Sequence, residues 1–256
     1  MSLITNTLRS LAPHVLIEQH RRKFQMGRLG LPGSKAIAEA VATCRFDLWP
    51  PALRQPGQPW TLLDVGANTG EFTRAVSSLI ALAGVHAFEP QPSCHTELKQ
   101  ALAGLSNSHL HPVAVGAEAG EIELLCTANS KLASVLKPTA NVADGYGGGD
   151  FNVQQHLKVP LVRLDDVIPA GTPIGLLKID VQGYELPVLE GARETLRSTA
   201  ALLMEVNYVP HYEGGATFDD LCEAVRAHGF RTFGISAPYG GPKGPLWADA
   251  LFVRAD

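Results

Sequence analysis

The sequence predicts an α/β fold, a three-layer sandwich in which helices cover both faces of a seven-stranded, mostly parallel sheet with an antiparallel terminal strand. From residue 60 onward, short apolar runs alternate with helical stretches, which is typical of a parallel sheet buried on both faces. The last two apolar runs, residues 230–235 and 248–254, are joined by a connection too short for a helical crossover. We therefore expect this last pair to be antiparallel.

An N-terminal helical appendage precedes the sheet. Leucines and valines recur at roughly helical steps in residues 1–49, and the basic segment His20–Lys23 follows the first of them. This pattern fits a helix that packs on the protein with a solvated basic end, or one that makes weak contact with a membrane surface. Prolines in residues 50–59 break the helix. We therefore divide the chain into an appendage with a proline-rich linker, residues 1–59, and a larger domain, residues 60–256.

Strands and helices alternate in the larger domain. We expect core strands at residues 60–65, 85–88, 109–115, 175–181, 201–206, 230–235 and 248–254. We expect helices at residues 69–82, 93–103, 184–197 and 217–228. Residues 121–126 and 132–136 alternate like an antiparallel insertion, and residues 159–164 predict a further short strand. The glycine-rich residues 144–150 predict a loop that closes over a substrate as a lid, or one that only connects two elements.

Composition limits the class of function. The chain has 256 residues, 45% of them hydrophobic, and a formal net charge of -4. No broad basic surface is implied, so we expect no nucleic-acid partner. The scattered cysteines indicate reduced thiols in a cytoplasmic protein. No apolar run is long enough to span a bilayer, and the N-terminus lacks the pattern of a signal peptide.

The first motif is Asp64-Val-Gly-Ala-Asn-Thr-Gly70, followed by Glu89-Pro90 at the spacing of nucleotide-binding folds, roughly 20 residues. A glycine turn lets the backbone approach a ligand, and the helix N-terminus adds exposed N–H groups. Glu89 can accept hydrogen bonds from a ribose diol. Because Asp64 repels a pyrophosphate but attracts an ammonium group, the motif favours an amino-acid-bearing nucleoside such as S-adenosylmethionine. The alternative is an ordinary tight turn in which Asn68 caps the helix.

Acidic residues end the fourth and fifth strands. Asp180 leaves the sheet beside the first strand, so it can orient a hydroxyl, accept its proton or bind a metal; the alternative is a helix cap. Glu205 ends the next strand, and His211 beyond it can act as a base near neutral pH or remain an exposed loop histidine. The two carboxylates could share a Mg²⁺ ion. No ligand-dense segment accompanies them, so we predict no metal.

Taken in order, these segments resemble the FkbM family of S-adenosylmethionine-dependent methyltransferases. The matching segments are Asp64–Gly70, Ala87–Pro90, Leu164–Asp166, Leu177–Gly183 with Glu185, Val188–Gly191 and Met204–Glu205. The resemblance covers residues 60 to 235 and implies O-methylation of a hydroxyl on a sugar, glycan or natural product. It also implies that Ala114 and Val115 lie near the adenine, Glu89 near the ribose, and Asp180 near the transferred methyl group.

These arguments give two sets of site residues. The cofactor set is Asp64, Gly66, Ala67, Asn68, Gly70, Glu89, Pro90, Ala114 and Val115, and the catalytic set is Asp180, Glu205 and His211. The family usually has Glu where this chain has Gln182; if that acid assists catalysis, activity here is weaker or uses another base. The expected fold is that of a class I methyltransferase, and the expected partner is a small-molecule or glycan acceptor.

Two other functions stay open. One is an NAD(P)-dependent oxidoreductase on a similar sheet, which the absence of Gly-x-Gly-x-x-Gly disfavours. The other is a nucleoside-binding module without catalysis. The sequence does not predict the oligomeric state or name the acceptor.

Overall fold

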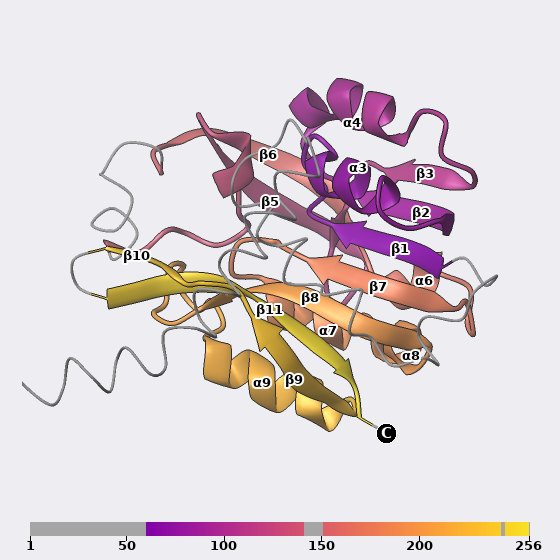
Figure 1. Ribbon diagram of the computed structural model, residues 1–256. Helices are drawn as coiled ribbons and strands as arrows, with labels where there is room; N and C mark the ends of the chain where they lie inside the picture. The colour runs from indigo at the N-terminus through magenta and orange to yellow at the C-terminus, as the bar shows by residue number, and fades with distance from the viewer. Residues whose placement is uncertain (1–59, 141–150, 242–243, 256) are drawn as a thin grey trace, which may run out of the picture.

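The computed structural model describes residues 60–140, 151–241 and 244–255; the predicted appendage and the glycine-rich loop lie outside them. The larger of two sheets (Figure 1) contains β1 (Trp60–Val65), β2 (Leu82–Phe88), β3 (Ser108–His111), β7 (Ile174–Ile179), β8 (Thr199–Asn207), β9 (Phe230–Ile235), β10 (Tyr239–Gly241) and β11 (Gly244–Arg254). Its strand order is β10-β11-β8-β7-β1-β2-β3, and β9 also pairs with β11. The pairs that join β3, β2, β1, β7 and β8 are all parallel.

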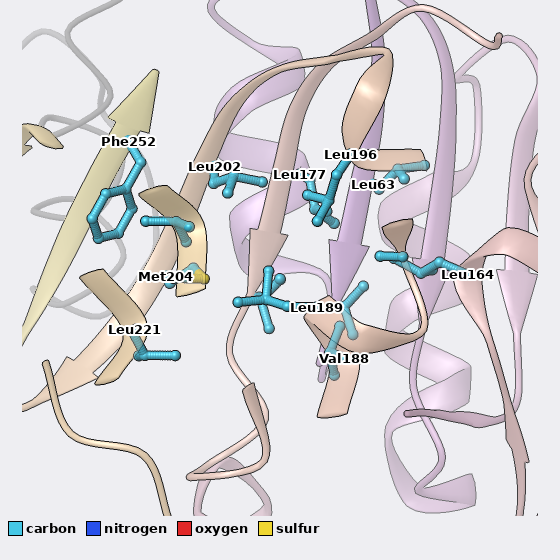
Figure 2. Packing of buried hydrophobic residues seen from close by; sticks show 14 of the residues in the cluster. Leu63, Leu164, Leu177, Val188, Leu189, Leu196, Leu202, Met204, Leu221 and Phe252 are labelled. Atoms are coloured by element: carbon cyan, nitrogen blue, oxygen red, sulfur yellow. The ribbon is translucent and has the colours of Figure 1, made fainter. Parts of the chain in front are cut away.

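Helices cover both faces of this sheet, which confirms the predicted three-layer arrangement. On one face lie α3 (Glu71–Ser77) and α4 (His95–Leu102), whose Phe72 and Leu98 pack with Leu62 of β1. On the other lie α6 (Leu164–Val167), α7 (Glu185–Glu190), α8 (Arg193–Arg197) and α9 (Phe218–Ala227). On this second face, Val188 of α7 and Leu221 of α9 belong to a separate cluster of buried apolar residues (Figure 2). Within the described part of the chain, none of the helices has the length and apolar character that crossing a membrane requires.

The end of the sheet is antiparallel, as predicted. β11 pairs antiparallel with both β8 and β9. The sheet has eight strands rather than the seven predicted, because the connection at residues 236–247 contains β10, which forms a hairpin with β11. The ring of Tyr239 stacks on that of Trp247 with centroids 4.0 Å apart, and this pair stabilises the hairpin.

The insertion forms a second, three-stranded sheet of order β4-β6-β5, made of β4 (Ala114–Val115), β5 (Gly120–Thr127) and β6 (Val153–Val162). The predicted strand at residues 109–115 is divided between the two sheets, because Pro112 lacks an N–H group and interrupts the ladder. The strand predicted at residues 132–136 is reduced to a single antiparallel bridge, between Ser134 and Leu125 of β5. The main partner of β5 is β6, and the 3₁₀ turn η3 (Ser130–Leu132) occupies the start of the predicted segment.

The helix predicted at residues 184–197 is divided into α7 and α8. A Cβ at Gly191 would lie 1.9 Å from the carbonyl oxygen of Gly116, so the main chain approaches too closely for any other residue. The Asp165 carboxylate accepts hydrogen bonds from the N–H groups of Glu194 and Thr195, at 3.1 and 2.8 Å, and so caps the start of α8. Both contacts fix residues around the insertion to the helices beneath the large sheet.

Candidate active site

A cavity of about 270 Å³ lies where β1, β2, β7 and β8 end. The carboxyl ends of parallel strands meet at one edge of a sheet, and ligands bind outside that edge. The walls come from the turns after these strands and from the insertion. The volume is close to the lower end for small-molecule pockets, about 300 Å³. The strand order therefore produces one pocket from segments that are far apart in the sequence.

The turn after β1 packs directly against the end of β7. Gly66 has a φ of 77°, and a Cβ there would lie 1.9 Å from the carbonyl oxygen of Asp180. The N–H groups of Gly66 and Ala67 donate to the carbonyl oxygen of Phe88, at 3.0 and 3.1 Å. These two N–H groups therefore bind the turn to β2. The exposed N–H groups that we predicted are those of the helix N-terminus, and this helix, α3, begins at Glu71.

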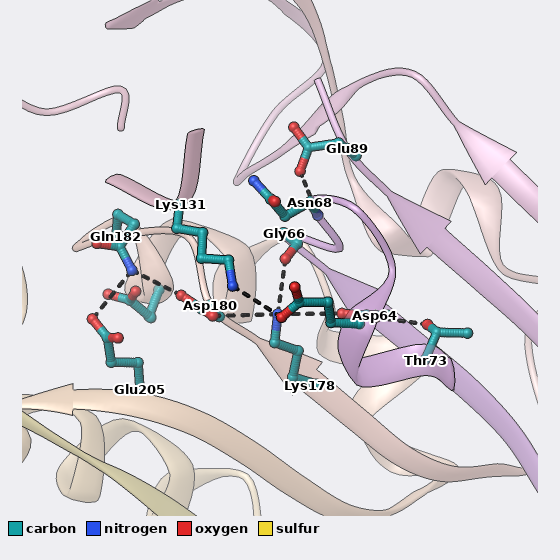
Figure 3. A network of polar contacts seen from close by, with 12 residues as sticks. Asp64, Gly66, Asn68, Thr73, Glu89, Lys131, Lys178, Asp180, Gln182 and Glu205 are labelled. Carbon is teal, nitrogen blue, oxygen red and sulfur yellow. Dashed lines mark hydrogen bonds and ion pairs between the residues drawn. The ribbon is translucent and has the colours of Figure 1, made fainter. Parts of the chain in front are cut away.

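Glu89 lies at the end of β2, and it lines the cavity together with Pro90. One carboxylate oxygen accepts the N–H group of Asn68 at 2.8 Å (Figure 3). The other accepts the N–H group of Gln91, also at 2.8 Å. Burial raises the pKa of the Glu89 carboxyl, although these N–H groups and the Lys178 ammonium act in the opposite direction. Since each carboxylate oxygen can accept more than one hydrogen bond, Glu89 retains the capacity to bind a diol.

Asp64 lies behind the turn and is not among the residues that line the cavity. It is 0% exposed, accepts a hydrogen bond of 2.7 Å from the Thr73 hydroxyl, and lies 3.3 Å from the Lys178 ammonium. We predicted that Asp64 attracts an ammonium group of the ligand. The ammonium that it faces in the structure is that of Lys178, so Asp64 acts on the cavity only through its neighbours.

Lys178 is a site residue that the sequence analysis missed. Its Nζ donates to the carbonyl oxygen of Gly66 at 2.8 Å and lies 3.3 Å from the Asp180 carboxylate (Figure 3). Burial alone lowers the pKa of Lys178, but the Asp64 and Asp180 carboxylates outweigh it and hold that pKa above the usual value. The signal was available, because a lysine inside the buried apolar strand β7 needs charged partners.

Asp180 and Glu205 meet at the acidic end of the cavity. Gln182, also missed as a contact residue, donates from Nε2 to Asp180 Oδ1 at 2.9 Å and to Glu205 Oε1 at 3.3 Å. Burial raises the pKa of Glu205 well above its usual value, and the negative charges of Asp180, Glu185 and Asp249 raise it further. When it is ionised, a carboxylate with a raised pKa binds a proton more strongly than an ordinary carboxylate does.

Part of the cavity wall is apolar. Ala114 and Val115 line it, together with Leu124 and Val135 of the insertion. The Ser130 hydroxyl accepts a hydrogen bond of 3.1 Å from the Asn68 side chain, which joins η3 to the turn after β1. This arrangement offers an apolar surface for a flat heterocycle next to Glu89.

Besides Asp64, two other predicted residues, Gly70 and His211, do not line the cavity. Gly70 precedes α3 with a φ of 77°, and a Cβ there would lie 2.5 Å from the Cβ of Ala101. Gly70 therefore permits the close packing of α3 on α4. His211 is 3% exposed, and burial lowers its pKa to about 4. Its position away from the cavity wall removes the basis for a catalytic role.

The described residues also bear on the Mg²⁺ alternative. They contain no group of three or more histidine, cysteine, aspartate or glutamate residues arranged to hold a metal ion. The Gln182 amide supplies a hydrogen-bond donor to both Asp180 and Glu205.

Comparison with known proteins decides the family. A sequence model of the methyltransferase FkbM domain matches residues 64–232, which include Glu89, Asp180 and Glu205. The chain belongs to the FkbM methyltransferase family. It is 32% identical over 166 residues to methyltransferase sdnD of Sordaria araneosa, a match that covers 54% of this chain and 62% of that protein. It is 29% identical over 161 residues to 2-O-methyltransferase NoeI of Sinorhizobium fredii, which covers 60% of this chain and 65% of that protein.

A third relative and a solved structure extend the comparison. The chain is 27% identical over 201 residues to 31-O-demethyl-FK506 methyltransferase FkbM of Streptomyces tacrolimicus, a match that covers 69% of this chain and 74% of that protein. The chain spans less than two thirds of the length of sdnD and NoeI. The crystal structure of methyltransferase FkbM from Methylobacillus flagellatus superposes with a TM-score of 0.50 at 15% identity, covering 91% of this chain and 59% of that one. The shared fold is the class I Rossmann-like fold that the sequence predicted.

Proposed function

We propose that this chain is an S-adenosylmethionine-dependent methyltransferase that methylates a hydroxyl group of a small molecule or glycan. The observation that carries the proposal is one cavity that connects Glu89, at the end of β2, with Asp180 and Glu205, beyond β7 and in β8. Its apolar wall, buried carboxylate and acidic end suit, in that order, a heterocycle, a ribose diol and a cationic sulfonium. The donor set therefore fits this cofactor.

The residues divide into those that bind the cofactor and those that face the acceptor. Ala114 and Val115 cover the adenine, and Glu89 accepts hydrogen bonds from the ribose hydroxyls. When bound, S-adenosylmethionine supplies an electrophilic methyl group. Holding the acceptor hydroxyl in line with that methyl group contributes roughly 7–11 kcal/mol to lowering the barrier.

Glu205 is the proposed general base, and Asp180 the residue that orients the acceptor. Asp180 accepts a hydrogen bond from Gln182 and pairs with Lys178, and these two contacts hold its carboxylate in a position to orient the acceptor. The raised pKa of Glu205 suits proton transfer from a hydroxyl, an effect worth about 10²–10⁴-fold in rate. NoeI is named a 2-O-methyltransferase, and the Streptomyces relative is named a 31-O-demethyl-FK506 methyltransferase. Both names support a hydroxyl as the acceptor.

The test uses S-adenosylmethionine with a labelled methyl group, incubated with the protein and with separate small-molecule and glycan extracts. We expect label in a base-stable O-methyl product, and loss of most of the turnover in Asp180→Asn with little change in cofactor affinity. S-adenosylhomocysteine should raise the melting temperature, whereas NAD should not. Stabilisation by NAD alone would favour an oxidoreductase, and cofactor binding without any labelled product would indicate a binding module.

A further inference from the structure

Gln182 connects the two carboxylates at the acidic end of the cavity. Its Nε2 donates to both Asp180 and Glu205 (Figure 3). A carboxamide nitrogen carries two N–H groups, so one side chain can serve both acids. Without a donor between them, two carboxylates at one site repel each other. The amide therefore stabilises an arrangement that the acids alone disfavour.

Tyr212 determines which way this amide points. Its hydroxyl donates to Gln182 Oε1 at 2.8 Å. Tyr212 is buried, and its ring packs so closely against Gly183 that a Cβ there would lie 2.9 Å from the ring. The reversed amide would direct Oε1 at two carboxylates, so only the observed orientation satisfies Tyr212, Asp180 and Glu205 together.

The backbone at Gln182 indicates that its side chain matters. The residue has a φ of 56°, a left-handed conformation that is uncommon for residues other than glycine. The Ser134 hydroxyl donates to its carbonyl oxygen at 2.7 Å and helps to hold this conformation. Glycine would fit the backbone without strain but would lose every side-chain contact described above. A strained residue next to reactive groups is typical of functional sites.

We infer that Gln182 is a positioning residue: its carboxamide, oriented by Tyr212, holds Asp180 and Glu205 in one arrangement toward the acceptor hydroxyl. The purpose of this arrangement rests on the proposed methyl transfer, but the arrangement itself can be tested without an acceptor. The titratable groups that face Glu205 are Asp180 after β7, Glu185 of α7 and Asp249 of β11, and all three are acids. The hydrogen bond from Gln182 opposes their effect and lowers the pKa of Glu205. Loss of the amide should therefore make Glu205 harder to ionise.

The experiment follows the Glu205 carboxyl by ¹³C NMR in the full-length protein saturated with S-adenosylhomocysteine, with the resonance assigned by its absence from Glu205→Gln. Gln182→Leu should shift the titration midpoint of Glu205 to higher pH. Tyr212→Phe should shift it in the same direction by less, because the amide remains but loses its orientation. In the Gln182→Leu background, the effect of Tyr212→Phe should be smaller than in the wild-type protein, since the hydroxyl contacts the amide that Gln182→Leu removes.

The matched control is Gln91→Leu, the same substitution at a cavity glutamine whose side chain donates to the Ser130 carbonyl oxygen instead. It should leave the Glu205 midpoint unchanged. Gln182→Gly, which relieves the strained φ, replaces Gln182→Leu if the latter does not fold. An unshifted midpoint in the folded Gln182 variant, or an undiminished Tyr212→Phe effect in its background, would overturn the inference. If the wild-type protein methylates nothing but the midpoints shift as expected, the inference stands and the proposed function fails.

Discussion

Removal of the Lys178 ammonium should destabilise the protein more than its position in a strand suggests. Lys178→Met removes the ammonium group that faces the Asp64 carboxylate, which is 0% exposed. The carboxylate keeps its negative charge and its hydrogen bond from the Thr73 hydroxyl. It also removes the donor to the Gly66 carbonyl oxygen. Breaking a buried ion pair on one side costs about 3–5 kcal/mol. At roughly 2–4 °C for each kcal/mol, the melting temperature should fall by about 6–20 °C.

Urea unfolding followed by circular dichroism measures this effect. Lys131→Met is the matched control, because Lys131 pairs with Glu71 at 2.9 Å with its side chain 43% exposed. An exposed pair is worth less than about 1 kcal/mol. Adding Asp64→Asn to Lys178→Met should restore part of the lost stability, because the buried charge disappears. Equal unfolding midpoints for the two lysine variants would refute the reasoning.

Three further predictions concern single residues. Glu89→Gln should weaken binding of S-adenosylhomocysteine about 10–100-fold in calorimetry, since hydrogen bonds to a charged group contribute about 1.5–3 kcal/mol; unchanged affinity would contradict its role. Gly66→Ala should lower the free energy of unfolding by about 3 kcal/mol or more, because its Cβ would meet the Asp180 carbonyl oxygen. Gly171→Ala is the control: Gly171 also has a positive φ, 79°, but a Cβ there would meet open space, so this substitution should cost much less. Burial raises the pKa of Glu185 from 4.5 to about 7, so its contribution to stability is complete below pH 4.5 and is lost as the pH rises through about 7. In urea unfolding, Glu185→Gln should reduce the fall in the free energy of unfolding as the pH rises from 4.5 through about 7. An unaltered pH dependence would count against this role of Glu185.

Most of the large sheet could be predicted because its buried strands are local signals in the sequence. A strand buried on both faces must be a continuous apolar run, and β7 is buried at every position. The short connection before β11 also determined the antiparallel end. The insertion could not be predicted in the same way, because β5 and β6 each have several exposed positions and weak alternation. Their pairing depends on contacts between residues 26 to 41 positions apart, from Thr127 with Val153 to Gly120 with Leu161, which no local pattern reveals.

Site residues divide along a similar line. Residues at strand ends, such as Glu89 and Asp180, were predictable because topology places every strand end at one edge. The direction in which a residue faces could not be predicted. Asp64 and Gly70 face other groups of the protein rather than the cavity. Tyr212 could not be linked to the site either. It follows β8 by several residues and reaches Gln182 only because the chain folds back over Gly183.

The polar contacts form one row in which acids and donors alternate across three strands: Asp64, Lys178, Asp180, Gln182 and Glu205. Each donor in the row is shared by two acids. Loss of a donor therefore leaves two acids facing each other, and the effect must reach beyond its immediate neighbours. Lys178→Met should free the Asp180 carboxylate to compete with Glu205 for the Gln182 amide. The stability of the turn after β1 and the ionisation of Glu205 are then properties of a single network. Asp64 and Glu205, at its two ends, are linked only through the residues between them.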